Sequence, residues 1–180
     1  MTVKHHVQMM TRYMEWADSV MIGNASRLSE EELVRERDAL FGSISGTFDH
    51  ILLVGEVFKA HLEGVAHPHA SRHRQQTRAF SVVAEELRQM NRYYVEMADS
   101  FDVAALDEVI KFEFVGGGPG AMSRAEILLH LANHSTYHRG FISTMLYSSR
   151  IEGKANDLSV FLRDAWPELL ARLPSENFNG

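Results

Sequence analysis

Three histidines stand four residues apart in the stretch HLANHSTYHRGF, residues 130–141: His130, His134 and His138. On an α-helix a step of four residues turns about 400°, so the three imidazoles would lie within ~80° of one another. Imidazoles that neighbour one another on a helix face can bind a divalent metal ion. They can also be polar residues along a helix seam, and the spacing by itself leaves both interpretations open.

A metal site needs a further ligand from outside this stretch, and His50 is the best candidate. It lies in an apolar segment with Phe48, Ile51 and Leu52. A histidine in such a segment is either a core residue with a hydrogen-bond partner or a metal ligand. We interpret His130, the surplus member of the group, as a core residue or as a residue that braces a ligand.

Several polar residues stand near these histidines in the sequence, but none is assigned a catalytic role. Asn133 is a candidate brace for a ligand, because metal-bound imidazoles usually donate their second N–H to a polar group. Tyr137 and Arg139 flank His138, and a turn of ~100° per residue should point them aside. We expect Arg139 to make a structural or dimer contact. Glu56 is six residues from His50, about 240° around the helix, and should not face the metal.

Residues 64–79 contain three histidines and three arginines but no carboxylate. We expect a solvated loop, and the alternative is a positive segment that attracts an anionic substrate. We further expect His5, His6 and His61 at the surface and Trp16 in the core, with pocket lining as the alternative for Trp16. The members of the loop group are His67, His69, Arg72, His73, Arg74 and Arg78.

Composition narrows the classes of protein to which this chain can belong. The absence of cysteine excludes disulfides, thiolate nucleophiles and thiolate metal ligands. A net charge of −6 argues against nucleic acid as a partner, since its binding proteins are usually basic. No apolar run approaches the ~20 residues of a membrane span, and the first residues lack the apolar core of a signal peptide. We therefore expect a cytoplasmic protein that binds neither nucleic acid nor a membrane.

The elements that must position the histidines are helices, because apolar residues recur with helical spacing along most of the chain. Ser29–Glu32 and Ser123–Glu126 have the form of capping boxes, and the first should open a short helical turn. The pattern predicts an all-α four-helix bundle in one domain, 1–180, with an extra C-terminal helix and a short strand near 108–114. The four long helices are expected at about 5–27, 43–63, 81–100 and 123–149, and the extra helix at about 157–170.

Four stretches, in this order, carry a resemblance to a known family. They are YMEWADSVMIGNASRLSEEEL (13–33), HILLVGEVFKAHLEG (50–64), SRAEILLHLANHSTYHRGFISTML (123–146) and NDLSVFLRD (156–164). The third, with its N-H-x-x-x-H-R-G pattern, is the most specific of the four. Together they resemble the DinB-like (DinB/YfiT) family of metal-binding four-helix-bundle proteins.

The resemblance implies metal ligands at His50, His134 and His138, helices connected up-down-down-up, and a homodimer. The ion would be a divalent transition metal, with zinc or nickel favoured over iron or manganese. The superfamily includes S-transferases that use low-molecular-weight thiols, and a maleylpyruvate isomerase. The resemblance therefore implies a metal-dependent enzyme, a thiol S-transferase or a hydrolase, that activates water or a low-molecular-weight thiol to attack a small-molecule substrate.

Two non-enzymatic functions are the alternatives: a metal-binding or stress-response protein, and a structural helical dimer that binds metal incidentally. An open metal position beside a pocket would favour the enzyme, whereas apolar side chains such as Phe58 and Phe141 sealing the ion would favour the others. The chain also departs from the family pattern at four positions. They are Gly55, where relatives often have Asp, Phe58 for Trp, Phe141 for Gln and Asn156 for Thr.

Overall fold

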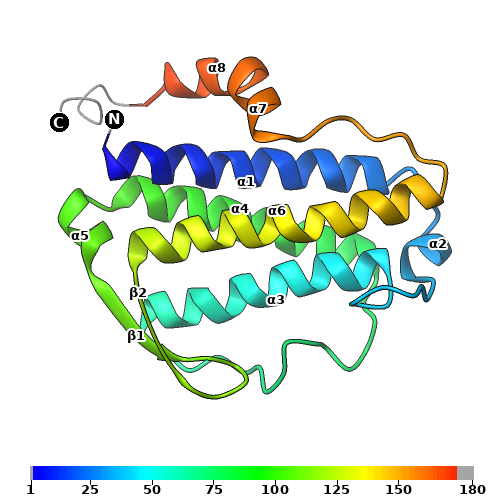
Figure 1. Cartoon of the computed structure of the whole chain (residues 1–180), viewed down its shortest axis with the longest axis horizontal. Helices are drawn as coiled ribbons and strands as arrows, with labels where there is room; N and C mark the ends of the chain where they lie inside the picture. Colours follow the sequence, from blue (N-terminus) through cyan, green and yellow to red (C-terminus); the bar gives the residue numbers. More distant parts are fainter. Residues whose placement is uncertain (1, 174–180) are drawn as a thin grey trace.

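The computed structural model describes residues 2–173; the other positions of the expected domain 1–180 lie outside the described residues. Four long helices form the bundle in Figure 1, and each helix lies against two others. Helices α1 and α3 both pack on α4 and on α6, so that α1 lies diagonally across from α3. The prediction of an all-α bundle is confirmed. The helices are α1 (Val3–Ala25), α3 (Ile44–Glu63), α4 (Phe80–Ser100) and α6 (Arg124–Ser148).

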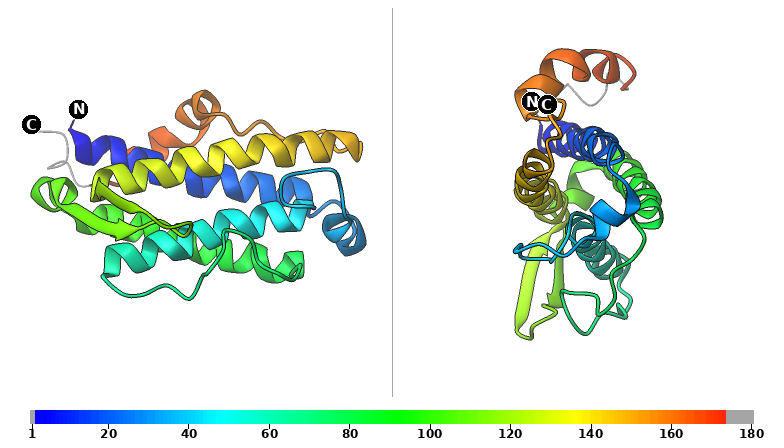
Figure 2. Two further views of the ribbon diagram at one scale, coloured as in Figure 1. Left: turned by 60° about the horizontal axis from the view of Figure 1, so that its bottom comes forward. Right: turned by 90° about the vertical axis from the view of Figure 1, so that its right-hand side faces the viewer.

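The connectivity is up-down-down-up, as the resemblance implies. Helices α3 and α4 begin at the same end of the bundle, where the Ser45 hydroxyl donates to the Arg78 carbonyl at 2.9 Å. At that end the Phe80 N–H also donates to the carboxylate of Glu30, in the short helix α2 (Glu30–Val34). The segment 64–79 has to return along the whole length of the bundle to join these two parallel helices (Figures 1 and 2).

Apolar residues at helical spacing from all four helices meet along the bundle axis. One cluster joins Met21 and Ile22 of α1 to Phe48 of α3 and Ile142 of α6. A second cluster fills the other end, around Tyr94 of α4 and Leu128, Leu131 and Ala132 of α6. Burying each large aliphatic or aromatic side chain contributes about 1.5–3 kcal/mol, so the bundle is held mainly by these two clusters. None of the helices within residues 2–173 has the length and apolar character that crossing a bilayer requires.

The two predicted capping boxes differ in the structure. At Ser123 the box is complete: its hydroxyl accepts from the Glu126 N–H, and the Glu126 carboxylate accepts from the Ser123 N–H. At Ser29 only the first half is present, because the carboxylate of Glu32 instead pairs with Arg35 and Arg37. The helical turn expected there is α2.

The predicted strand is β1 (Val109–Glu113), and the structure adds elements that the sequence did not predict. β1 pairs antiparallel with β2 (Pro119–Ser123), in a register that places Val109 opposite Ser123. Gly117 and Gly118 adopt φ of 86° and 96° in the turn, a conformation that glycine adopts without steric cost. A short helix, α5 (Val103–Asp107), precedes the hairpin.

The prediction of a single helix over 157–170 is wrong. Two short helices, α7 (Leu158–Asp164) and α8 (Trp166–Leu170), replace it, and the chain breaks at Ala165 with φ −119°. Pro167 explains the break, because it has no N–H to donate to a preceding turn and suits the first turn of a new helix. Both helices pack on α1, through Phe161 and Trp166.

Candidate metal centre

Three histidines from two helices meet between α3 and α6. The Nε2 atom of His134 lies 3.2 Å from Nε2 of His50 and 3.1 Å from Nε2 of His138. One ring nitrogen from each of the three lies within 4.8 Å of the others. The structure thus brings together the three positions singled out in the sequence. It leaves His130 out of the group, although the His130 ring lies 5.7 Å from the His134 ring.

The two faces of α6 have separate roles. His134 and His138 are one turn apart and face α3, as a spacing of four residues requires. Ser135 and Arg139 are also four apart, and they face α1, where both side chains contact the carboxylate of Asp18. The interactions of α6 with α1 therefore fix the rotation of α6 that points its two histidines at His50.

A hydrogen bond to the chain itself fixes the protonation of His50. Its Nδ1 lies 2.9 Å from the carbonyl oxygen of Arg72, in the loop between α3 and α4. A carbonyl oxygen can only accept, so Nδ1 carries the proton and the lone pair of Nε2 is free to face the other two histidines. Phe41 stacks on the same ring, with centroids 3.9 Å apart and planes tilted by 14°. His50 is thus held both in its plane and in its tautomer.

Burial keeps the imidazoles of the cluster neutral. It lowers the pKa of His134 to about 3, with added repulsion from His138, His50 and His130. Burial and the proximity of His50 lower the pKa of His138 to about 4. The pKa of His50 is also lowered, chiefly by burial. A metal ligand must be a neutral imidazole, so all three groups are in the form that binds an ion at neutral pH.

The cluster opens onto a cavity of about 590 Å³. Most of its wall is apolar, contributed by α3 and by the hairpin, and Tyr137 and His130 of α6 also line it. Phe58 lines the cavity but leaves the three histidines accessible to it, while Phe141 is not among the lining residues. Neither of the two proposed sealing residues closes the site.

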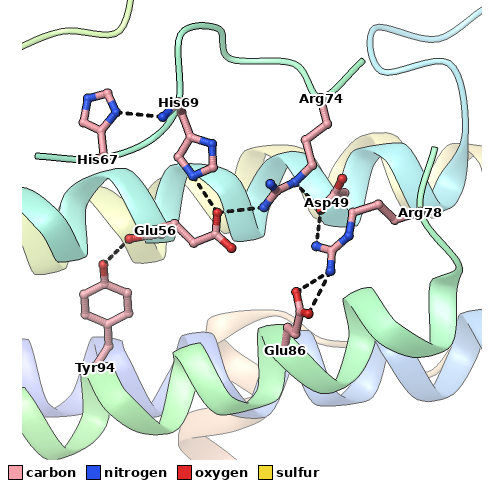
Figure 3. A network of polar contacts seen from close by, with 9 residues as sticks. Asp49, Glu56, His67, His69, Arg74, Arg78, Glu86 and Tyr94 are labelled. Carbon is pink, nitrogen blue, oxygen red and sulfur yellow. Dashed lines mark hydrogen bonds and ion pairs between the residues drawn. The ribbon is translucent and has the colours of Figure 1, made fainter. Parts of the chain in front are cut away.

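Most of the loop 64–79 is exposed, as expected, but ion pairs that the sequence did not predict bind it to the bundle (Figure 3). Arg74 donates to Asp49 at 3.0 Å and to Glu56 at 2.7 Å. Arg78 binds Asp49 at 3.2 Å and pairs with both carboxylate oxygens of Glu86. His69 also contacts Glu56, at 2.7 Å. Glu56 thus faces the loop and not the metal cluster, as expected.

A buried polar network joins the family motifs on α1, α6 and the segment before α7. Arg139 and Asp18 are almost completely buried and form an ion pair at 2.7 Å. Arg139 also donates to the hydroxyl of Tyr13 at 3.0 Å, and this hydroxyl donates to the carbonyl of Asn156 at 3.1 Å. The structural contact expected for Arg139 is therefore made within its own chain. The hydrogen bond from Tyr13 ends on the backbone carbonyl of Asn156, so having Asn at this position, where relatives usually have Thr, does not remove it.

The remaining expectations had mixed outcomes. Trp16 packs on Phe161 and is absent from the cavity lining, so its expected role in the core is confirmed. His5 is buried against Trp166, so its expected surface position is wrong; His6 is exposed, as expected. His61, expected at the surface, stacks on the hairpin and lines the cavity.

Two residues next to the ligands in sequence behave differently from expectation. Tyr137 does not simply point aside: its large ring lies 4.9 Å from that of His138 and borders the cavity. Asn133 is exposed and, among the described residues, makes no hydrogen bond to the three imidazoles. The group that braces one of the three histidines, His50, is the Arg72 carbonyl, which the sequence did not predict, and the ring of Phe41 stacks on the same imidazole.

Gly55, one of the departures from the family pattern, lies where α3 and α4 approach closely. A Cβ atom at this position would lie 3.1 Å from Cγ of Met90, and the Tyr94 hydroxyl donates to the Gly55 carbonyl at 2.6 Å. The Asp that is common in relatives would require the Met90 side chain to shift. The glycine at position 55 is therefore explained by the close packing of α3 against α4.

Comparisons with known proteins agree with this architecture. The sequence model of the DinB family matches residues 1–148. The protein DinB of Bacillus subtilis (strain 168) is 24% identical over 159 residues, which cover 83% of this chain and 90% of that protein. A crystal structure of a DinB-like protein from Bacillus cereus ATCC 10987 superposes with a TM-score of 0.58 at 18% identity. That superposition covers 77% of this chain and 89% of the other, and it establishes similarity of fold.

Proposed function

Because the chain belongs to the DinB family, we propose that it is a metal-dependent enzyme whose divalent transition metal binds to His50, His134 and His138. The single observation that supports this most strongly is the position of the three imidazoles, which converge in the wall of a cavity large enough for a small molecule. The proposed reaction is attack by an activated water or a low-molecular-weight thiol on that molecule.

The donor set fits such an ion. Two imidazoles on one tetrahedral zinc, each at ~2.0–2.1 Å, have nitrogens about 3.3 Å apart. The separations of 3.2 Å and 3.1 Å about His134 are close to that value. The hydrogen bond from His50 to the Arg72 carbonyl supplies the outer contact that metal-bound imidazoles usually make. Zinc and nickel, followed by iron and manganese, are the ions we propose for this nitrogen-only set.

Three protein ligands suit a catalytic ion better than a structural one. Structural zinc sites close with four protein ligands, whereas catalytic sites keep a position for water or substrate. When bound, a divalent ion lowers the pKa of a coordinated water or thiol toward neutrality. The residues of the chain have three tasks: the imidazoles hold the ion, α3 and the hairpin exclude bulk water, and the cavity orients the substrate.

The cavity distinguishes this proposal from the two non-enzymatic alternatives. A protein that only stores metal, or a dimer that binds it incidentally, has no need of a hollow of about 590 Å³ beside the ligands. Enzyme and ligand pockets usually have volumes of ~300–1,000 Å³, with a mainly apolar wall and few polar groups. The site has both properties.

Metal content and turnover together test the proposal. Protein purified without an affinity tag or chelator should contain close to one transition metal per chain, and the His134→Ala/His138→Ala variant should contain none. His130→Gln is the matched control, because it removes an imidazole one turn away on the same helix and should retain the metal. Metal-loaded protein should then accelerate consumption of cysteine or glutathione by an alkyl halide, or hydrolysis of an ester. Absence of metal, with no uptake of added zinc, nickel, iron or manganese, would refute the proposal.

We propose further that the protein forms a homodimer through the outer face of α6. From residue 129 to residue 149 no exposed residue of this helix is charged, although the chain has a net charge of −6. Tyr137, Phe141 and Tyr147 stand on this face, and Tyr147 is 82% exposed. In a two-fold dimer the same face of each copy contacts its partner. An uncharged face with aromatic side chains can be buried in this way without removing a charge from water.

The test of the dimer is molar mass in solution by light scattering. Tyr147→Asp should produce a monomer, because each copy would bury a carboxylate in the apolar interface. Val65→Asp, at an exposed apolar residue in the α3–α4 loop, should leave the dimer intact. A monomeric wild type, or equal masses for the two variants, would contradict the assignment.

A further inference from the structure

The cavity beside the three histidines has no negative charge in its wall. Among the described residues that line it, there is no Asp and no Glu, although the chain has 24 of them. The wall also contains six histidines, of which burial keeps His50, His134 and His138 neutral, and one arginine, Arg72. A bound anion would therefore meet the cation of Arg72 in this wall and no carboxylate that repels it.

Arg72 is the cation of the loop that remains unpaired. Its neighbours Arg74 and Arg78 are neutralised by Asp49, Glu56 and Glu86. Arg72 forms no ion pair within residues 2–173, yet it lines the cavity. Its charge is permanent at any working pH, and its planar group binds a carboxylate with two parallel hydrogen bonds. Of the three arginines in the loop, Arg74 and Arg78 form ion pairs with the bundle, and Arg72 remains available to bind an anion at the cavity.

The backbone of Arg72, an exposed residue, is held by a histidine of the cluster. The Arg72 carbonyl accepts a hydrogen bond from Nδ1–H of His50, so the backbone from which the Arg72 side chain extends cannot move without disturbing that imidazole. The charge of Arg72 is also close enough to contribute to the lowered pKa of His50, after burial and the neighbouring His73. A group bound to Arg72 would therefore lie beside the proposed reactive centre.

The rest of the cavity suits an apolar body. Leu53, Val57 and Phe58 of α3 form one wall, and Phe112 and Phe114 of the hairpin form another. The Phe58 and Phe112 rings meet edge to face, with centroids 5.5 Å apart. Aromatic side chains of this kind bind apolar and aromatic groups through buried area and ring contacts.

We propose that the cavity binds small molecules that combine an apolar, aromatic body with a carboxylate, and that the carboxylate binds Arg72. This inference rests on the proposed function, since it names the class of substrate presented to the three-histidine centre. The hairpin and α3 hold the body, and Arg72 orients the charged end.

Calorimetry with three matched probes at pH 7.5 tests this inference: 4-phenylbutyrate, 4-phenylbutanol and 4-phenylbutylamine, which differ in charge and share one apolar body. Each is titrated into the metal-loaded protein and into chelator-treated protein whose melting curve shows that it is folded. We expect the acid to bind at least tenfold more tightly than the alcohol, and the amine to bind most weakly, in both forms. Equal affinity for acid and alcohol in the chelator-treated protein would overturn the inference.

Two variants separate the charged end from the apolar body. Arg72→Gln should weaken binding of the acid at least tenfold and that of the alcohol less than twofold. Arg88→Gln is the control, because it removes the same charge from the surface of α4, where Arg88 pairs with Glu85. Phe114→Ala, at a half-exposed residue of the hairpin, should weaken acid and alcohol alike. Equal effects of Arg72→Gln and Arg88→Gln would refute the role of Arg72.

The same preparations distinguish failure of this inference from failure of the proposed function. If the protein binds one metal per chain but does not prefer the acid, the metal centre is supported and the substrate class proposed here is refuted. Protein that prefers the acid through Arg72 but takes up no metal supports the binding site and refutes the metal-dependent enzyme.

Discussion

Acidification of the metal-free protein should destabilise it through the buried histidines of the cluster. The pKa values of His134 and His138 are about 3 and about 4 in the folded chain, against an ordinary value of 6.5. The causes are burial and the facing imidazoles, with His50 on α3 acting on both. Because the folded state disfavours the proton, stability is fully present above pH 6.5 and is lost as the pH falls toward 4 and then 3.

The size of the loss follows from these values. Between pH 7.5 and pH 5.0 each unfolded imidazole takes up nearly one proton, while the folded ones take up almost none. Integration over that range gives about 2 kcal/mol for each histidine, or about 4 kcal/mol for the pair. A chain of this length loses roughly 2–4 °C in Tm for each kcal/mol. The pair should therefore lower Tm by about 8–16 °C over this pH range.

Thermal melts of chelator-treated protein, followed by circular dichroism at half-unit pH steps, measure this effect. The His134→Gln/His138→Gln variant keeps polar side chains of similar size but has no group that titrates at these positions. Its Tm should therefore fall by about 8–16 °C less than that of the wild type over the same pH range. His6→Gln removes an exposed histidine and should follow the wild type. The reasoning would be refuted by a double variant whose Tm falls as steeply with acid as that of the wild type.

Three further predictions concern the metal, the buried ion pair and the contact between α3 and α4. Zinc at a hundredfold excess over its Kd should stabilise the wild type by about 2.7 kcal/mol, a rise in Tm of roughly 5–11 °C, and should not stabilise His50→Ala. Asp18→Ala should cost about 3–5 kcal/mol in a denaturant titration, because it leaves Arg139 buried without its counter-charge; a cost below 1 kcal/mol would contradict this. Gly55→Asp should cost about 2 kcal/mol or more, from the clash with Met90 and a buried carboxylate. Met90→Ala should restore part of that loss, and no rescue would mean that the clash is not the cause.

Long helices were predictable where residues close together in sequence mark the ends of the helix and its buried face. The helix expected over 43–63 is Ile44–Glu63, and the one expected over 123–149 is Arg124–Ser148. Ser43 and Ser123 cap these helices through their hydroxyls, and Gly64 ends the first with φ 69°. A cap and a period of 3.6 residues are properties of neighbours in sequence, so a single chain displays them.

Elements that depend on distant partners were less predictable. Strand β2 has the sequence PGAMS, which lacks β-branched and aromatic residues, and it forms because β1 lies beside it. The ion pairs of the loop 64–79 were not predictable, because its cations have no acidic neighbours in sequence. Asp49, Glu56 and Glu86 supply the opposite charge from two other helices, a pairing that exists only after the bundle forms.

The candidate site was predicted by residue type and by resemblance, and only partly by spacing. A step of four residues places His134 near His138, but His50 is 84 residues away from His134 and nothing local indicates the contact. The Arg72 carbonyl could not have been foreseen, since every residue has a backbone carbonyl and no pattern marks the one that will meet an imidazole. Phe41 likewise reaches His50 from a loop without regular structure.

The H-R-G motif acquires a physical explanation once both faces of α6 are considered. Arg139 follows His138 directly, so a turn of ~100° directs it toward α1, where it meets Asp18 while His138 meets His50. An ion pair buried on both sides has few alternative geometries, because any rotation of α6 would leave the charge of Arg139 without a partner. The pair therefore restricts the angle at which His134 and His138 approach α3. A site whose facing Nε2 atoms lie 3.1 Å and 3.2 Å apart tolerates little rotation, so we infer that the motif joins a proposed metal ligand to the residue that sets its orientation.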